Sequence, residues 1–313
     1  MPTVSVVIPT YNRSEFLYEA INSVFHQTYQ DFEVIVVDDG STDNTESIIS
    51  KFDGRVRYFK QANSGSAVAR NRGILNSRGN FIAFLDSDDL WYPQKLEKQI
   101  KVFEKHPDVG LVFCDCSRGN SMSFPAPKRG YFSNVNFSQG NLFPLLCKMN
   151  PVWTPSVICR YEVFNYSGLM DHTLRRAQDI DLWIRIASIT NAFFLREVLV
   201  HVREHKERIS YNTDFLYDVC RKCDIQVSRW SSCDEKLVSI LKEKAADRYY
   251  QLSYVERKKG NYYKSYLALC KSMRYMKKPY KYWPRKFITR FFPIIFKIYD
   301  RYRPILSDSK HNT

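Results

Sequence analysis

The stretch FIAFLDSDDLW, residues 81–91, places an apolar run directly before three carboxylates, Asp86, Asp88 and Asp89. Three more runs of β-branched and aromatic residues have strand length, at 4–10, 32–39 and 55–61, and the fourth strand is predicted at 80–88. Helical patterns at 14–27, 44–52 and 66–77 separate them. Because strands and helices alternate at this spacing, the sequence predicts an α/β fold with a mostly parallel central sheet covered by helices.

Polar residues follow several of these strands. In parallel sheets ligands bind at the carboxyl ends of the strands, and Asp38, Asp39, Asp86 and Asp88 lie there. Strand alternation predicts that Asp86 and Asp88 share one side while Asp89 faces away. Two adjacent carboxylates are costly to ionise without a cation, and Mg²⁺ or Mn²⁺ binds one or two carboxylates together with phosphate oxygens. The alternative is that Asp86 or Asp88 caps a helix that starts near residue 93.

Local signals predict two helix starts and a turn. Asn12 with Glu15, and Asp43 with Glu46, have the spacing of capping boxes. The segment DDGSTDN, residues 38–44, has the composition of a turn, in which Gly40 supplies conformational freedom. Asp38 and Asp39 are expected to face opposite ways.

Four segments in order resemble the catalytic domain of family 2 glycosyltransferases, which are inverting sugar transferases with a GT-A-type nucleotide-diphospho-sugar transferase fold. They are VSVVIPTYNR (4–13), VIVVDDGSTDNT (34–45), ANSGSAVARNRGI (62–74) and FIAFLDSDDLW. The resemblance implies a catalytic domain at 1–211, with a nucleotide-sugar half at about 1–115 and an acceptor half at about 116–211.

The resemblance also implies the donor site. Pro9, Tyr11 and Asp39 correspond to the nucleotide pocket, with Asp39 accepting from the N–H edge of a uracil-like base. Arg70 would lie near the diphosphate, although an Arg in a helix is often only solvated. Asp86, the fifth residue of the nucleotide site, would also bind the metal.

The remaining metal ligands are assigned in the same way. Asp88 and Asp86 would form the metal motif for Mn²⁺ or Mg²⁺. The segment VREHKERIS, residues 202–210, resembles a family segment that places His205 near the metal or the diphosphate. An isolated His is also commonly structural.

In the acceptor half, residues 110–116 are predicted as a core strand and 117–140 as a long surface loop. The segment RRAQDIDLWIRIA, residues 175–187, resembles the family segment that carries the catalytic base, and Asp179 takes that position, with Gln178 in place of the usual Glu. Asp179 is expected on the core-facing side of the helix and Asp181, the rival, on a different side, and a helix cap is the structural alternative. Trp153 could face a sugar ring, but we expect it to be buried.

The C-terminal part differs in composition. Residues 212–276 are predicted to form a helical hairpin extension broken at Gly260 and Asn261, and 277–313 a basic amphipathic tail. Residues 242–303 hold 18 basic and 4 acidic residues, an excess equal to the chain's whole net charge of +14. Basic and aromatic residues at helical spacing favour an anionic membrane surface, and a helix docked on the catalytic domain is the alternative. No recognition motif accompanies the charge, so no nucleic acid partner is expected.

The eight cysteines are expected to be reduced, since no cleavable signal was recognised and the chain is too long to need disulfides. Cys220 and Cys223 form a lone CxxC, which is not expected to bind zinc.

Together, the resemblance and the basic C-terminal part predict a cytoplasmic enzyme, peripheral on the inner face of the cytoplasmic membrane. The resemblance implies that it moves a sugar from a nucleotide-sugar donor to a saccharide or lipid-linked acceptor in cell-surface polysaccharide synthesis. A nucleotidyltransferase and a catalytically inactive sugar-nucleotide-binding protein are the alternatives.

Overall fold

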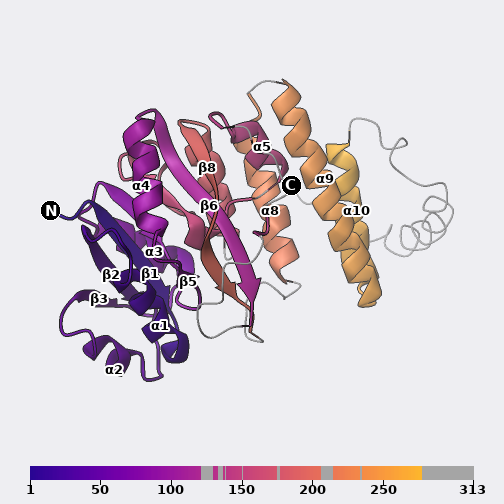
Figure 1. The fold of residues 1–313 in the computed structure, drawn as a ribbon. Helices are drawn as coiled ribbons and strands as arrows, with labels where there is room; N and C mark the ends of the chain where they lie inside the picture. The colour runs from indigo at the N-terminus through magenta and orange to yellow at the C-terminus, as the bar shows by residue number, and fades with distance from the viewer. Residues whose placement is uncertain are drawn as a thin grey trace. The chain divides into compact units, whose positions relative to one another are not determined.

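The computed structural model describes residues 1–120, 130–132, 137, 139–149, 151–174, 177–205, 214–232 and 235–276. The chain divides into two compact units, Met1–Tyr211 and Asn212–Thr313 (Figure 1).

The first unit is built on one eight-stranded sheet in the order β3-β2-β1-β4-β7-β6-β8-β5. β1–β2, β2–β3, β1–β4 and β6–β8 pair in parallel, whereas β4–β7, β6–β7 and β5–β8 are antiparallel. The predicted parallel sheet is therefore found in the first half, and the second half is mixed. The strands are β1 (Val4–Thr10), β2 (Phe32–Asp38), β3 (Val56–Lys60), β4 (Phe81–Phe84), β5 (Leu90–Trp91), β6 (Val109–Gly119), β7 (Ile158–Arg160) and β8 (Asn191–Arg203).

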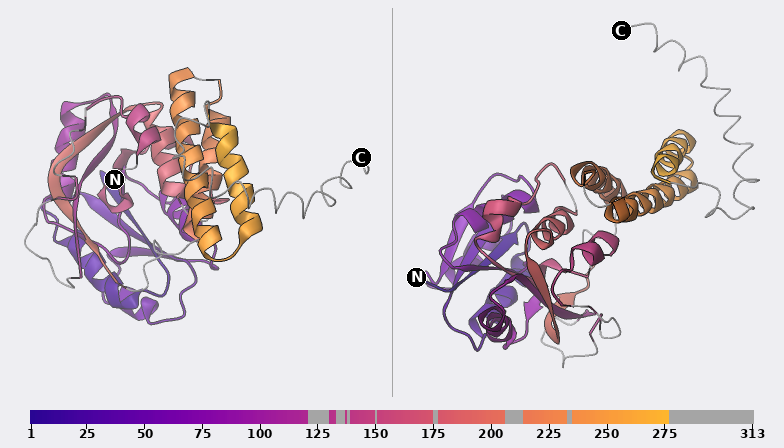
Figure 2. Two further views of the ribbon diagram at one scale, coloured as in Figure 1. Left: turned by 90° about the vertical axis from the view of Figure 1, so that its right-hand side faces the viewer. Right: turned by 90° about the horizontal axis from the view of Figure 1, so that it is seen from above.

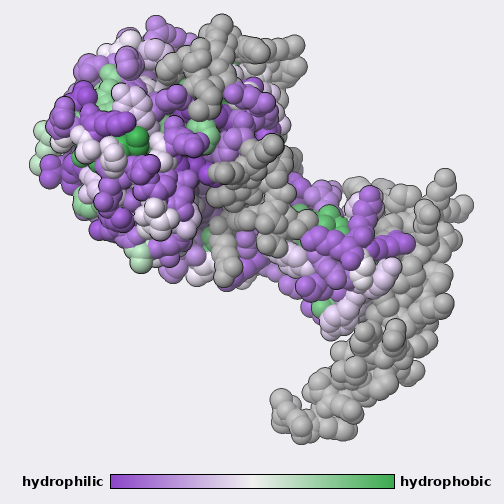
Figure 3. Space-filling view, turned by 90° about the horizontal axis from the view of Figure 1, so that it is seen from below, coloured by the Kyte–Doolittle hydropathy of each residue, from purple (hydrophilic) through white to green (hydrophobic). Residues whose placement is uncertain are grey.

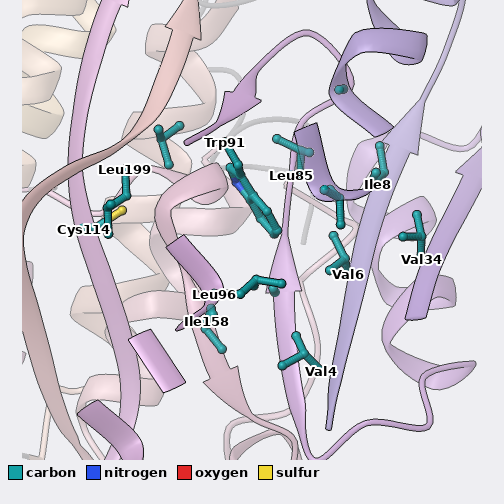
Figure 4. Packing of buried hydrophobic residues seen from close by; sticks show 14 of the residues in the cluster. Val4, Val6, Ile8, Val34, Leu85, Trp91, Leu96, Cys114, Ile158 and Leu199 are labelled. Carbon is teal, nitrogen blue, oxygen red and sulfur yellow. The ribbon is translucent and has the colours of Figure 1, made fainter. Parts of the chain in front are cut away.

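Helices cover both faces of this sheet, which explains why β1 is buried along its whole length. Val4, Val6 and Ile8 belong to a core cluster with residues of α1 and α4 and with Trp91 (Figure 4). On the other face, β2 packs against α3. The helical elements are α1 (Ser14–Phe25), α2 (Thr45–Ser50), α3 (Ser66–Leu75), α4 (Lys95–Lys105), α5 (Phe143–Lys148), the 3-10 turn η1 (Thr154–Ser156), α6 (Val163–Ser167) and α7 (Gln178–Ala187).

The fourth strand is shorter than predicted. β4 ends at Phe84, and residues 86–89 form a turn in which the Asp89 amide donates to the Asp86 carbonyl at 3.0 Å. Strand alternation therefore does not orient the aspartates. The alternative that Asp86 or Asp88 caps the next helix is wrong, because α4 begins at Lys95 and has no side-chain cap at its N-cap residue.

The predicted capping boxes are also wrong. α1 begins at Ser14, and Asn12 instead accepts a hydrogen bond from the Thr42 amide at 2.8 Å. Asp43 serves both helices, since one oxygen accepts from the Ser14 amide at 2.9 Å and the other from Thr45 Oγ1 at 2.6 Å. Burial raises the pKa of Asp43, but these hydrogen bonds outweigh it and lower the pKa overall. The cap of α1 is thus supplied by a residue distant in sequence.

One strand of the second half is longer than predicted. β6 continues to Gly119, so the first residues of the predicted loop at 117–140 belong to the sheet, and 121–129, 133–136 and 138 lie outside the described residues. β8 begins at Asn191, and its last five residues are all buried.

Lys95 is a buried cation at the start of α4. Its Nζ lies 3.9 Å from the centroid of the Trp91 ring and has no hydrogen-bond partner in the described ranges. Burial lowers its pKa from 10.5 to about 8. Because the unfolded chain binds this proton more tightly, the cost of burying the charge is fully present below pH 8 and disappears as the pH rises towards 10.5.

The second unit contains three described helices that run side by side, α8 (Asp214–Arg229), α9 (Glu235–Lys258) and α10 (Tyr262–Tyr275) (Figure 2). The predicted break is present, since Gly260 has φ +80° between α9 and α10. Asp224 joins the three helices, because it accepts from Tyr249 at 2.6 Å and from Tyr275 at 2.7 Å. The predicted tail at 277–313 lies outside the described residues.

Cys220 and Cys223 are buried free thiols whose pKa values are raised by burial. Within the described ranges, no three His, Cys, Asp or Glu residues are grouped so that they could hold a metal ion by themselves. In the same part of the chain, no helix has the length and apolarity needed to span a bilayer. The surface seen in Figure 3 is mainly hydrophilic, with scattered apolar residues.

Candidate active site

The carboxyl ends of the parallel strands bring the predicted site residues to one edge of the sheet. β4 and β6 both pair antiparallel to β7, so they run in the same direction as β1, β2 and β8. The residues after β2, β4 and β8 therefore lie along this edge together with the turn that precedes β7. This is the place where ligands bind in parallel sheets.

Asp38 and Asp39 face opposite ways, as predicted. Asp38 is fully buried and accepts hydrogen bonds from the Ser41 amide at 2.7 Å and from the Tyr58 hydroxyl at 2.6 Å. Burial and the Asp38 carboxylate together raise the pKa of Tyr58. Asp38 therefore holds the turn and the neighbouring strand.

Asp39 organises the loop that leads into α3. Its carboxylate accepts from Gln61 Nε2 at 2.8 Å, from the Ser64 amide at 2.9 Å and from the Gly65 amide at 2.7 Å. Gly40 makes this approach possible, because it has φ +87° and a Cβ there would lie 2.9 Å from the Asn63 amide nitrogen. A carboxylate can accept about four hydrogen bonds. Asp39 accepts three from the protein, which leaves one acceptor position for a ligand N–H.

Pro9 and Tyr11 lie on either side of the end of β1. Pro9 is buried within the strand, and Tyr11 is 47 % exposed. An exposed ring beside Asp39 is suited to stack on a planar base, because a tyrosine loses little conformational freedom when it binds.

Arg70 and Asp86 form an ion pair. Arg70 lies on α3 with only 7 % of its surface exposed, and its Nη2 donates to Asp86 Oδ1 at 2.5 Å. The Nε of Arg70 is buried and has no hydrogen-bond partner among the residues that the structure describes. A buried guanidinium with an unused donor is suited to an additional anionic oxygen, such as that of a diphosphate.

Asp88 has a different partner. The Nε2 of His205 lies 2.9 Å from Asp88 Oδ2, so this nitrogen carries the proton that is donated to the carboxylate. The His205 ring stacks on Phe16 of α1 with the two centroids 5.0 Å apart. The structure therefore brings His205 to the acidic turn from the far end of β8.

Arg203 fixes this turn and was not identified from the sequence as a site residue. It is 2 % exposed, and its Nε donates to the Asp88 carbonyl at 2.7 Å while its amide donates to Asp89 Oδ1 at 3.1 Å. Its guanidinium also pairs with Glu19 of α1. Asp89 thus faces away from the site, as predicted, and contributes to the fold.

The residues present fit a divalent cation that is shared with a substrate. Asp88 and Asp86 supply the carboxylate oxygens that Mg²⁺ and Mn²⁺ prefer, and neither is fully buried. The Nδ1 of His205 is buried and has no hydrogen-bond partner within the described part of the chain. Since no group of three protein ligands is present among the described residues, the other ligands would be phosphate oxygens and water.

Asp179 and Asp181 differ clearly in their surroundings. Asp179 is partly exposed at the start of α7, where it accepts from Thr154 Oγ1 at 2.9 Å and from the Ile180 amide at 2.8 Å. Asp181 is fully buried and pairs with Arg185 Nε at 2.8 Å. The prediction that they face different sides is confirmed, but the assumption that Asp179 lies on the core-facing side is wrong, because Asp181 is the more buried of the two.

Gln178 connects the two halves of the unit. Its Nε2 donates to Ser66 Oγ at 2.9 Å, directly after the loop that Asp39 organises, and its Oε1 is buried with no hydrogen-bond partner among the described residues. The residue is 7 % exposed. A Gln at this position therefore connects the start of α7 to the start of α3 without adding a charge.

Comparison with known proteins gives one family for this arrangement. Residues 5–202 match the model described as glycosyl transferase family 2. The chain spans between 30 % and 64 % of the length of the first curated relatives that it matches, which are uncharacterised glycosyltransferases of Rickettsia species. A putative teichuronic acid biosynthesis glycosyltransferase, TuaG of Bacillus subtilis, is 43 % identical over 104 residues, which is 32 % of this chain and 41 % of TuaG.

Solved structures share the fold. TarS of S. aureus, residues 1–349, has a TM-score of 0.65 and 19 % identity, with 88 % of this chain and 81 % of that one covered. The mannosyltransferase PcManGT of Pyrobaculum calidifontis, in complex with GDP-Man and Mn²⁺, has a TM-score of 0.60 and 19 % identity, with coverages of 89 % and 77 %. At these identities the similarity shows a GT-A-type fold.

Proposed function

Because the chain belongs to glycosyl transferase family 2, we propose that it transfers a sugar, with inversion, from a nucleoside-diphosphate donor to a hydroxyl group of a saccharide or lipid-linked acceptor. The observation that carries the proposal is the meeting of three groups at one sheet edge. The first group is Asp39, which is held by three hydrogen bonds. The second is the carboxylate pair, in which Asp86 contacts Arg70 and Asp88 contacts His205. The third is the partly exposed Asp179.

On the donor side, Asp39 accepts from the base N–H with its remaining acceptor position, and Tyr11 stacks on the base. A UDP-sugar fits this arrangement, and UDP-GlcNAc is the ligand in one TarS structure. Arg70 shares its guanidinium between Asp86 and the diphosphate. Asp88 and Asp86 would hold the Mn²⁺ or Mg²⁺ together with phosphate oxygens and water, with His205 beside them, and the ion would supply positive charge to stabilise the departing nucleoside diphosphate.

On the acceptor side, Asp179 is the general base. It takes the proton of the acceptor hydroxyl as that oxygen bonds to the anomeric carbon of the donor sugar, and the bonding electrons of the glycosyl–phosphate bond leave with the diphosphate. Attack from the side opposite the leaving group inverts the anomeric centre. Thr154 donates to one Asp179 oxygen and the Ile180 amide to the other, so the carboxylate is held in one orientation.

The acceptor belongs, in our proposal, to a cell-surface polysaccharide or glycolipid made at the inner face of the cytoplasmic membrane. The similarity to the putative teichuronic acid enzyme and the basic sequence of 242–303 support this. Residues 277–313 would bind the anionic membrane surface, because each lysine or arginine near such a surface contributes about 1 kcal/mol.

A nucleotide-release assay tests the activity. The protein is incubated with UDP-, GDP- and TDP-sugars and Mn²⁺ or Mg²⁺, with and without saccharide and lipid-linked acceptors. Release of the nucleoside diphosphate from one donor, raised by an acceptor, is the expected result. Pyrophosphate release from a nucleoside triphosphate and a sugar phosphate would show a nucleotidyltransferase, and nucleotide binding without turnover would show an inactive binding protein.

A further inference from the structure

The turn that carries Thr154 also carries a partly exposed tryptophan next to a well-exposed tyrosine. The ring centroids of Trp153 and Tyr131 are 5.1 Å apart with an interplanar angle of 49°. Tyr131 is 60 % exposed, and Trp153 is only partly buried, contrary to the expectation of a buried ring. We call these two residues the aromatic shelf.

The backbone under Trp153 is fixed by buried donors. The Trp91 indole donates to the Pro155 carbonyl at 2.8 Å, and Gln99 Nε2 donates to the Ser156 carbonyl at 2.9 Å. The Ser156 amide and hydroxyl both donate to the Trp153 carbonyl, at 2.8 and 2.7 Å. These hydrogen bonds hold the turn in place, and the Trp153 ring packs partly against the core and stays partly exposed, so little entropy would be lost when a ligand contacts it.

Tyr131 is held just as firmly. Its amide donates to the Cys116 carbonyl at the end of β6 at 3.0 Å, and the next amide, that of Phe132, donates to the buried Asp115 carboxylate at 3.0 Å. Gly130 is required for this contact, because a Cβ there would lie 1.9 Å from Asp115 Oδ2. A buried carboxylate thus anchors a segment whose central side chain remains exposed.

The position of the shelf indicates its ligand. Trp153 immediately precedes Thr154, whose hydroxyl donates to the Asp179 carboxylate, and Tyr131 lies at the carboxyl end of β6 on the same sheet edge. The hydroxyl that Asp179 deprotonates must lie within hydrogen-bond reach of it. Flat aromatic faces suit the C–H face of a pyranose ring, and they leave its hydroxyl groups free to react.

We propose that Trp153 and Tyr131 form the acceptor subsite, on which the apolar face of the acceptor's pyranose ring stacks while one of its hydroxyl groups points to Asp179. Asp115 and Gly130 act as positioning residues for Tyr131. This assignment rests on the proposed function, since it names the acceptor class of the same site, but its test does not require turnover.

The test follows the Trp153 indole directly. The full chain is labelled with 5-fluorotryptophan, and the Trp153 resonance is assigned from its loss in Trp153→Phe. With UDP and Mn²⁺ present, methyl β-D-glucopyranoside and methyl N-acetyl-β-D-glucosaminide are titrated, and sorbitol serves as an acyclic polyol without a pyranose face. A saturable shift of the Trp153 resonance with at least one pyranoside, and no shift with sorbitol, is expected.

Variants localise the effect. Tyr131→Ala is expected to weaken pyranoside binding about tenfold, because it removes one of the two aromatic rings that would contact the pyranose. Tyr166→Ala is the matched control, since Tyr166 is an 80 % exposed tyrosine on α6 and is expected to leave the titration unchanged. Equal responses to sorbitol and pyranosides, or an unchanged affinity in Tyr131→Ala, would overturn the subsite.

Two further outcomes separate this proposal from the proposed function. If a nucleotide sugar is turned over but no pyranoside moves the Trp153 resonance, the shelf is wrong and the transferase activity stands. If pyranosides bind but no nucleotide sugar is turned over, the shelf stands as a saccharide site and the activity is wrong. A shift produced by a UDP-sugar, and none by a pyranoside in the presence of UDP, would assign the shelf to the donor and overturn the acceptor assignment.

Discussion

Asp179 and Asp181 give a sharp test of the site, because they are only two residues apart in the sequence but have different partners and different burial on α7. We expect Asp179→Asn to abolish transfer while the fold is kept, and Asp181→Asn to weaken the fold. Each variant replaces a carboxylate by an amide of nearly the same shape. The two therefore separate the loss of a base from the loss of a buried charge.

The cost at Asp181 follows from its burial. Its side chain is fully buried and pairs at 2.8 Å with Arg185, whose guanidinium also donates to the carbonyls of Ser167 and Leu169. Removing one partner of a buried ion pair costs about 3–5 kcal/mol. Because the asparagine still accepts a hydrogen bond and two carbonyls still engage Arg185, we expect about 3 kcal/mol, which lowers the Tm of a unit of this size by about 6–12 °C.

The cost at Asp179 is smaller. The carboxylate is partly exposed and accepts from Thr154 and from the Ile180 amide, and an asparagine can keep one of these hydrogen bonds. Losing the negative charge in the first turn of α7 costs about 0.3–1 kcal/mol through the helix dipole. Loss of a general base, by contrast, lowers turnover by about 10²–10⁴-fold.

Thermal unfolding followed by circular dichroism measures the first effect, and nucleotide release with an acceptor measures the second. Calorimetric titration with the nucleoside diphosphate checks that Asp179→Asn still binds its donor product with nearly unchanged affinity. Wild-type turnover in Asp179→Asn, or a folded but inactive Asp181→Asn with an unchanged Tm, would show that the base has been assigned to the wrong residue.

Three other predictions concern the metal, the buried cation and the tail. Asp88→Asn is expected to keep the wild-type Tm but to lower turnover by about 100-fold or more, and full wild-type activity in a chelator would contradict it. Lys95→Met is expected to raise the free energy of unfolding by up to about 3 kcal/mol at pH 7. Urea titrations should show this difference from the wild type shrinking between pH 8 and 10, and a difference that stays constant would show that Lys95 does not titrate there. Removing residues 277–313 is expected to release the protein from anionic liposomes with an unchanged Tm, whereas a lower Tm would favour a helix docked on the protein.

The fold could be predicted where the residues within an element determine its structure by themselves. β1 and β2 are buried on both faces, and their β-branched runs are visible without any partner. The errors arose where a distant residue decides the outcome. The first helix is capped by Asp43 and not by Asn12, and the fourth strand ends at Phe84 because Arg203 binds the turn after it.

The candidate site divides in the same way. The residues predicted for the donor follow strand ends, so the positions of Asp39, Asp86 and Asp88 at this edge could be predicted from motifs, and their roles stay predictions. The acceptor half depends on contacts such as that of Gly130 with Asp115, which no local pattern contains. Likewise, Asp179 and Asp181 could not be ranked by helix periodicity, because α7 is buried on most of its surface and only the partners Thr154 and Arg185 distinguish them.

These contacts explain how an acidic cluster can lie at the end of a buried strand. The three carboxylates are not left to repel one another, because each has its own partner: Arg70 for Asp86, His205 for Asp88 and the Arg203 amide for Asp89. Asp89 is fully buried and holds the turn, whereas the side chains of Asp86 and Asp88 keep 26 % and 20 % of their surface exposed. Only the exposed pair can exchange its protein partners for a ligand. The same turn therefore separates a structural carboxylate from two that remain available to a donor substrate.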